Sequence, residues 1–95
     1  MTTLTRSLAR HREAAARSLA DTITTTPETH LELLQHLNQM WQKESADHTD
    51  NDRTWIAAVT ALDPHLRAAL RDRAYNAGQY AAARCLTHIN ATHAA

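Results

Sequence analysis

The chain has 95 residues, a formal net charge of zero at pH 7, one cysteine and no phenylalanine. A chain of this length forms one small domain and buries only about 60 to 65% of the surface that its unfolded form exposes. The single Cys85 excludes an intrachain disulfide and is typical of a reducing compartment. No hydrophobic run approaches the roughly 18 residues of a membrane span, so we expect a cytoplasmic protein without membrane contact.

The zero net charge hides a basic, acidic and again basic order along the chain. Residues 1–20 carry four arginines against one acid, and residues 53–95 carry five arginines against two acids. Between them, residues 21–52 carry seven acids against Lys43 alone. This order indicates association with partners, including copies of the same chain, rather than a particular fold.

The first helix is predicted over residues 3–23. Its buried side should hold the residues that recur at helical spacing, namely Leu4, Leu8, His11, Ala15, Leu19 and Ile23. The opposite, exposed side carries Arg6, Arg10, Glu13, Arg17 and Asp21. Pairs of Glu or Asp and Arg four residues apart stabilise such a face by a few tenths of a kcal/mol each, so part of it is an ordinary solvated surface.

Two more helices are predicted in the middle of the chain. Thr26 and Pro27 begin a helix over residues 27–45, because Thr can cap a helix and Pro suits its first position. Its apolar face is the strongest in the chain and consists of Leu33, Leu34, Leu37, Met40 and Trp41. A polar loop follows, and a short helix is predicted over residues 52–62.

The last predicted helix is also the longest, over residues 64–90. Asp63 can cap it and Pro64 suits its first position. Its apolar stripe is mostly small and comprises Leu66, Leu70, Ala74, Ala77, Ala81, Cys85 and Ile89. No alternating apolar pattern indicates a strand. The sequence therefore predicts an all-α fold, a single domain over residues 1–95 built as a bundle of four helices with a long C-terminal helix.

Catalytic and metal-binding patterns are absent from the sequence. No two of the seven histidines stand three or four residues apart, the usual spacing of metal ligands on a helix. Glu28, Glu32 and His36 come nearest, and we interpret them as a solvated polar face. Cys85 lies in a packing stripe, where a buried small hydrophobe is the simpler interpretation. We therefore expect no enzyme, no metal, no cofactor and no small-molecule substrate.

Arginines and one tyrosine form the most informative cluster. On the last helix Arg73, Tyr80 and Arg84 lie along one edge of the alanine stripe, and Arg67 and Arg71 form a second line. Arg offers a planar donor fork to phosphates and Tyr can stack on an unpaired base. The candidate nucleic-acid-binding residues are Arg6, Arg10, Arg17, Arg67, Arg71, Arg73, Tyr80 and Arg84. In the competing interpretation these arginines pair within the chain, with Asp72 or with the acidic middle segment.

These basic faces, set beside an acidic surface, resemble the small helical subunit of multi-subunit CRISPR effector complexes. The resemblance is one of class and carries over no individual residue. It implies a non-catalytic accessory subunit of a larger assembly, present in several stacked copies. Such a subunit stabilises RNA or single-stranded DNA without reading its sequence.

Two other interpretations of the sequence remain open. The chain can be a helical protein-binding regulator, such as an antitoxin, a phage-encoded inhibitor or an adaptor. It can also be a homodimer that completes its core across a twofold axis. The candidate protein-interface residues are Leu33, Leu37, Met40 and Trp41, with the acidic residues Asp47, Asp50 and Asp52.

Overall fold

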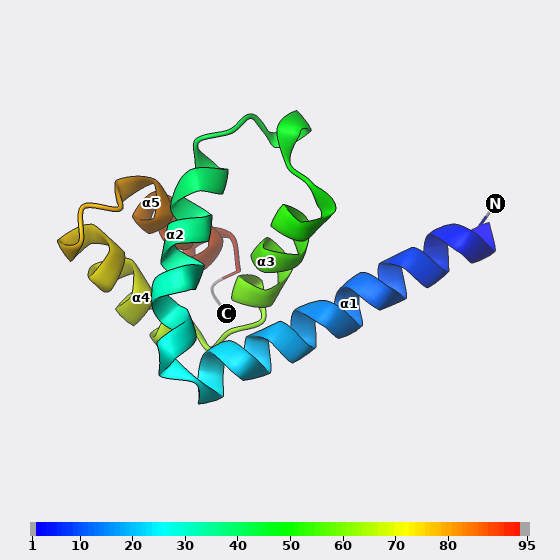
Figure 1. The fold of residues 1–95 in the computed structure, drawn as a ribbon, viewed down its shortest axis with the longest axis horizontal. Coiled ribbons are helices and arrows are strands. Elements are labelled where there is room, and N and C mark those ends of the chain that lie inside the picture. The colour runs from blue at the N-terminus through cyan, green and yellow to red at the C-terminus, as the bar shows by residue number, and fades with distance from the viewer. Residues whose placement is uncertain (1, 94–95) are drawn as a thin grey trace.

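The computed structural model describes the backbone of residues 2–93 and the side chains of residues 10–92. Over this range the chain forms helices and no strand (Figure 1), which confirms the predicted all-α class. The α-helices are α1 (Thr2–Thr25), α2 (His30–Trp41), α3 (Asp50–Thr60), α4 (Pro64–Asn76) and α5 (Tyr80–His93). Two short 3₁₀ turns, η1 (Pro27–Thr29) and η2 (Ser45–Asp47), precede α2 and α3. The prediction of four helices is wrong, because the described residues form five α-helices.

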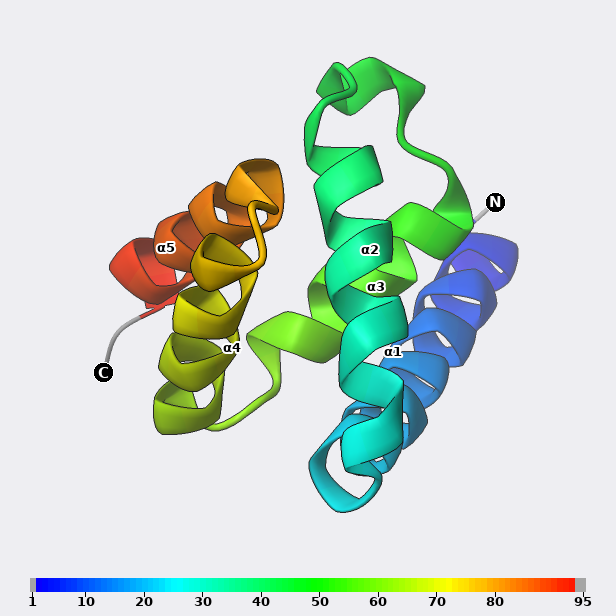
Figure 2. The same cartoon turned by 60° about the vertical axis from the view of Figure 1, so that its left-hand side comes forward.

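The helices pack in two groups on either side of α2. Helices α4 and α5 form an antiparallel hairpin, and α5 packs on α2. On the other side α1 packs on α3, and Figure 2 shows α2 between this pair and the hairpin. Helix α2 contributes four large, fully buried side chains to the core, Leu33, Leu34, Leu37 and Met40. Buried alanines, among them Ala58, Ala74 and Ala82, let the neighbouring helices approach closely.

Helix α1 buries a side that matches the predicted one only in part, because Ile23 is buried and Leu19 is partly buried against the core, as predicted. Ala16, Ala20 and Ile23 are buried, whereas His11 and Ala15 are exposed. Leu4 and Leu8, which set the predicted side, lie outside the described side chains. Ala16 and Ala20 take the buried places predicted for Ala15 and Leu19, because α1 packs mainly on the short α3 and not on a full bundle. Its N-terminal half projects beyond the body of the molecule (Figure 1).

The second predicted helix begins later and ends earlier than expected. Thr26 makes no side-chain cap bond, and the chain passes through η1 before α2 begins at His30. The Nε2–H of His30 donates to the carbonyl of Ile23 at 2.8 Å, and that of His48 donates to the carbonyl of Met40 at 3.2 Å. His30 therefore supplies a donor to a carbonyl near the C-terminal end of α1, where carbonyls lack intrahelical partners. His48 adds a second donor to the Met40 carbonyl, which also accepts the backbone N–H of Lys43 at 3.0 Å.

Helix α3 begins with a reciprocal capping box. The backbone N–H of Asp52 donates to the hydroxyl of Thr49 at 3.1 Å, and the backbone N–H of Thr49 donates to the carboxylate of Asp52 at 2.9 Å. Each residue thus satisfies a donor that the helix start leaves free. Because Thr49 is the cap, α3 starts and ends two residues earlier than predicted.

The predicted long C-terminal helix is two helices. Asp63 caps α4 as expected, accepting the backbone N–H groups of His65 and Leu66. The helix then stops at Gly78, whose φ of 77° lies in the left-handed region that only glycine adopts at little cost. The N–H groups of Gly78 and Gln79 donate back to the carbonyls of Tyr75 and Ala74, which is the Schellman pattern. The chain reverses here, and α5 returns along α4.

Candidate nucleic-acid interface

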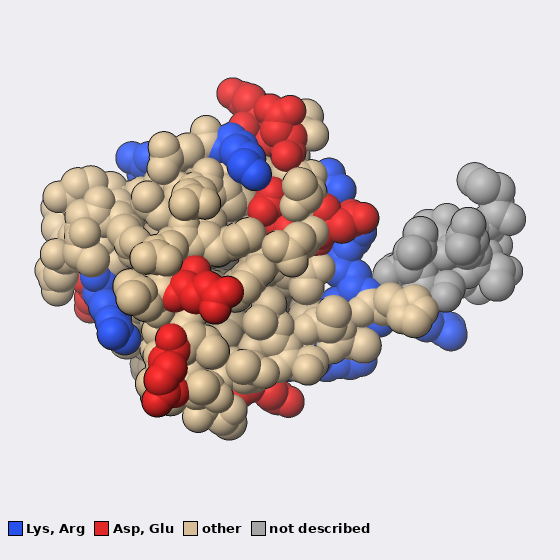
Figure 3. All heavy atoms as spheres, in the orientation of Figure 1, with Lys and Arg blue, Asp and Glu red and all other residues tan. Residues whose placement is uncertain are grey.

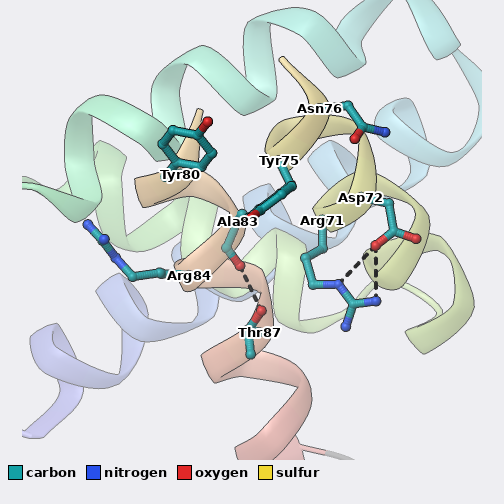
Figure 4. A pocket seen from close by; sticks show the side chains of 8 residues that line it. All are labelled: Arg71, Asp72, Tyr75, Asn76, Tyr80, Ala83, Arg84 and Thr87. Carbon is teal, nitrogen blue, oxygen red and sulfur yellow. Dashed lines mark hydrogen bonds and ion pairs between the residues drawn. The ribbon is translucent and has the colours of Figure 1, made fainter. Parts of the chain in front are cut away.

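The hairpin of α4 and α5 carries a surface groove of about 610 Å³ at the end where the chain turns. Its lining is polar, charged and aromatic, and Figure 4 shows the side chains: Arg71, Asp72, Tyr75, Asn76, Tyr80, Ala83, Arg84 and Thr87. Four of them stand before Gly78 and four after it, so both helices contribute equally. The groove exists because the chain reverses direction at this glycine.

The tyrosines and arginines of the groove are spaced symmetrically about the turn. Arg71 precedes Tyr75 by four residues on α4, and Tyr80 precedes Arg84 by four residues on α5. Residues four apart lie on one face of a helix. The antiparallel hairpin therefore places both tyrosines near the turn and each arginine one helical turn further from it.

Both tyrosine rings are exposed and they contact each other. Tyr75 is 64% exposed and Tyr80 is 55% exposed, and with Leu31 they are the large hydrophobic residues that the described surface exposes most. Their ring centroids lie 5.3 Å apart at an interplanar angle of 70°. Because both residues are more than half exposed in this edge-to-face arrangement, the pair presents aromatic surface to solvent on which another planar group can stack.

The two arginines of the groove differ in their partners. Arg71 donates from Nε and from a terminal nitrogen to the Asp72 carboxylate, at 3.2 and 3.1 Å. Arg84 is exposed and has no ion pair within the described residues. In Figure 4 Arg84 and Arg71 lie at opposite ends of the groove with Tyr75 between them. The groove thus has a net charge of +1, carried by Arg84.

The structure brings three of the predicted nucleic-acid-binding residues together, Arg71, Tyr80 and Arg84, and adds Tyr75. The prediction of one continuous helix put Tyr75 on the far side from Tyr80. The Gly78 turn places the two rings in contact instead. The only glycine of the chain, at the centre of the symmetric spacing, was the sequence signal that could have revealed this.

Arg67 is not part of any exposed basic face, so its prediction as a surface contact is wrong. Its side chain is 2% exposed. Its Nε donates to the side-chain carbonyl of Asn90 at 2.7 Å, and a terminal nitrogen donates to the backbone carbonyl of Thr60 at 2.6 Å. Arg67 therefore ties the C-terminal end of α3 to α5, where unpaired carbonyls and the helix dipole favour a cation.

The other predicted arginines lie away from the groove. Arg73 is exposed in the last turn of α4, where a positive charge suits the negative end of the helix. Arg10 and Arg17 are exposed on α1, which lies beyond α2 and α3 from the hairpin in Figure 2. Arg6 lies outside the described side chains. On the face seen in Figure 3 several basic side chains gather on the side from which α1 projects, and acidic side chains are scattered over the rest of the body.

Most of the predicted protein interface is core. Leu33, Leu37 and Met40 are each at most 1% exposed, so they cannot dock a partner, and that prediction is wrong. They are buried because α5 and α3 pack on α2 from two sides. Trp41 is half-buried against this core, with its ring centroid 5.6 Å from that of His88.

The three acidic residues of the predicted interface lie in three different environments. Asp52 is 3% exposed, so its prediction as a contact residue is also wrong. Asp50 is exposed and accepts from Arg12 at 2.9 Å, joining α3 to α1. Asp47 is exposed in η2. The acidic segment thus pairs with Arg12 on α1 through Asp50. Among the described residues it forms no ion pair with Arg71 or Arg84 of the groove.

A polar cluster surrounds Asp52 between α2 and α3. The backbone N–H of Thr49 and, after it, the ammonium of Lys43 at 3.3 Å lower the pKa of Asp52 from 3.8 to about 2, although burial acts in the opposite direction. Nε2 of His36 lies 3.0 Å from the same carboxylate, at ion-pair distance but without hydrogen-bond geometry. The His36 ring stacks on Trp55 at 5.0 Å. This cluster stabilises the start of α3.

The described residues bear on three other kinds of feature: a reactive cysteine, a metal site and a membrane-spanning helix. Cys85 is fully buried, and burial raises the pKa of its thiol to about 12, so it is inert at neutral pH. No three His, Cys, Asp or Glu side chains of these residues converge as a metal site. None of the described helices combines the length and apolar character that crossing a membrane requires.

Comparisons of the chain with protein-family models, curated proteins and solved structures find no significant match.

Proposed function

We propose that the chain is a cytoplasmic, non-catalytic helical accessory subunit that contacts RNA or single-stranded DNA through the groove between α4 and α5, without reading sequence. The observation that carries the proposal is the pair of exposed tyrosines flanked by Arg71 and Arg84. Guanidinium groups bind phosphates in a planar, two-pronged manner, and aromatic rings stack on unpaired bases of any sequence. The small helical CRISPR subunits, which the sequence resembles as a class, stabilise RNA or single-stranded DNA through basic helix faces without reading its sequence.

The charge of the groove sets the expected strength of binding. Two arginines reach at most two phosphates, so the logarithm of the binding constant should fall with the logarithm of salt concentration at a slope of about −1.4 for a single strand. Binding by one copy is therefore weak. In an assembly that holds several copies along one strand, the contacts add through a high effective concentration.

Binding of single-stranded RNA and DNA across a salt series tests the proposal. The double variant Arg71→Glu, Arg84→Glu should lose the salt-dependent binding. Its matched control is Arg17→Glu, Arg73→Glu, which changes the charge equally at exposed positions outside the groove. Helix content and urea unfolding confirm that both variants fold. If the wild type does not bind at low salt, or if both variants lose binding equally, the groove is not the contact site.

A protein-binding role is the second candidate, and the projecting half of α1 favours it. Described residues on this half, including Arg10, His11 and Ala14, are exposed, and Figure 1 shows the helix extending past the body. A helical segment of roughly ten residues is marginal in water without tertiary contacts, so a partner would stabilise it. That partner is either a copy of this chain or another subunit.

Light scattering and hydrogen exchange distinguish these roles. A self-associating chain should give a mass above 10.6 kDa that rises with concentration, with amide protection appearing in the first half of α1. A monomeric mass with rapid exchange in that segment excludes a partner copy, and would leave only a different protein as the partner of α1.

A further inference from the structure

We infer that the groove takes an unpaired nucleobase, stacked on the tyrosine pair between two phosphates, and so binds single strands in preference to duplex. This inference rests on the proposed function and specifies its ligand. The proposed function already includes stacking on unpaired bases. The inference adds that the tyrosine pair forms a single base subsite with a phosphate on either side, and that this subsite favours single strands over duplex.

The first argument is the shape of the tyrosine pair. The rings meet at 70° with centroids 5.3 Å apart, so they form a corner and leave a face of each ring free. Figure 4 shows the Tyr80 ring above Arg84 and the Tyr75 ring between Arg84 and Arg71. A flat base can stack on one ring and place its edge near the other. Within a duplex both faces of each base are already covered by neighbouring bases.

The second argument is the placement of charge around this corner. The spacing puts one arginine one helical turn beyond each tyrosine, away from the turn, and Figure 4 shows the two arginines on opposite sides of Tyr75, across the hairpin. In a single strand each base is attached to a sugar that has a phosphate on either side. A base on the tyrosine corner therefore has its two phosphates directed toward Arg71 and Arg84.

Asp72 makes Arg71 and Arg84 unequal in their ability to bind a phosphate. It holds Arg71 through two hydrogen bonds, whereas Arg84 is exposed without an ion pair within the described residues. The first phosphate therefore binds at Arg84. The second phosphate must compete with the Asp72 carboxylate for Arg71, so it contributes less.

Three ligands, each eight nucleotides long, distinguish binding of the base from binding of the phosphates. They are oligothymidylate, an abasic oligomer with the same number of phosphates, and a duplex. Binding is measured by fluorescence anisotropy at low salt. The wild type should bind oligothymidylate on the order of tenfold or more tightly than the abasic oligomer, and also more tightly than the duplex.

Two variants test whether the tyrosines cause this difference. Tyr75→Ala, Tyr80→Ala should bind oligothymidylate and the abasic oligomer equally, while keeping the salt-dependent abasic binding. Tyr75→Phe, Tyr80→Phe retains the rings and should keep the tenfold difference. Helix content and urea unfolding of each variant show that the hairpin is intact.

The outcomes distinguish this inference from the proposed function. Equal wild-type binding of oligothymidylate and the abasic oligomer, with a normal salt dependence, overturns the base contact and leaves the phosphate contact standing. The same holds if the duplex binds as tightly as the single strand. No binding of any ligand at low salt overturns the proposed function and the inference together.

Discussion

Tyr75 and Tyr80 meet edge to face across the turn at Gly78, with ring centroids 5.3 Å apart and an interplanar angle of 70°. They stand five positions apart in sequence, and on one continuous helix they would point in different directions. The contact therefore depends on the reversal of the chain at a single glycine. The groove and the functional proposal depend on the same residue.

Replacing Gly78 by alanine should destabilise the protein by about 1–2 kcal/mol, because the φ of 77° is unfavourable for a residue with a Cβ. No atom lies within 4 Å of the added Cβ, so the loss comes from backbone conformation and not from a clash. Urea unfolding measures it. The control Ala77→Gly, at an exposed right-handed position, should cost less than about 1 kcal/mol. An equal loss in both variants would argue against the strained turn.

Arg67→Ala should destabilise the fold by about 3 kcal/mol or more. The variant leaves the carbonyls of Thr60 and Asn90 without their donor and creates a cavity where the buried guanidinium lay. Arg73→Ala, on the exposed side of the same helix, should stay within about 0.5 kcal/mol of the wild type. Urea unfolding of the two variants compares them directly. Similar small losses would show that Arg67 does not join α3 to α5.

Asp52 should make the stability of the fold depend on pH in the acidic range. Its folded pKa of about 2 lies below the ordinary 3.8, so the folded state favours the ionised carboxylate. The resulting stabilisation is complete above about pH 4 and is lost as the pH falls toward 2. Asp52→Asn lacks this contribution. In urea unfolding at several pH values the wild type should exceed the variant at pH 6 and approach it near pH 2. A constant difference over this range would contradict the assignment.

Asp72→Asn should tighten the binding of single-stranded oligonucleotides. The substitution frees Arg71 from its carboxylate partner and raises the net charge of the groove from +1 to +2. The salt dependence should become steeper, because a second phosphate is then fully engaged. Asp63→Asn is the matched control, since it makes the same charge change outside the groove and Asn also caps helices well. If both variants gain affinity equally, overall charge and not release of Arg71 is the cause.

Cys85 should resist thiol reagents in the folded protein. It is fully buried, and burial raises the pKa of its thiol to about 12, so hardly any thiolate exists at pH 7. Labelling with a disulfide reagent should proceed only as fast as the chain unfolds and should accelerate with urea. Rapid labelling in native buffer would show that α5 does not stay packed on the core.

The sequence was sufficient for the fold class, the cap at Asp63 and the burial of Cys85, because each depends on local pattern or local chemistry. It was insufficient where long-range packing decides. The buried side of α1 depends on which helix it meets, and the pattern alone favoured Leu4 and Leu8. Whether Leu33 and Leu37 face the core or a partner likewise depends on how α3 and α5 cover α2.

The candidate site was predicted in part. Arg71, Tyr80 and Arg84 were identified as a basic and aromatic cluster, but Tyr75 was missed and Arg67 was assigned to the surface. Both errors follow from treating residues 64–90 as one helix. Arg67 also illustrates a general difficulty, because an arginine without a nearby carboxylate in sequence gives no sign that backbone carbonyls will hold it.

The most direct test of the nucleic-acid contact is a titration of the ¹⁵N-labelled chain with oligothymidylate at low salt, followed by backbone amide chemical shifts. The groove predicts that the largest shifts occur between Arg71 and Thr87, centred on Tyr75 and Tyr80, and that they disappear as salt is added. Shifts centred on α1, or no shifts at millimolar oligonucleotide, would contradict the central claim.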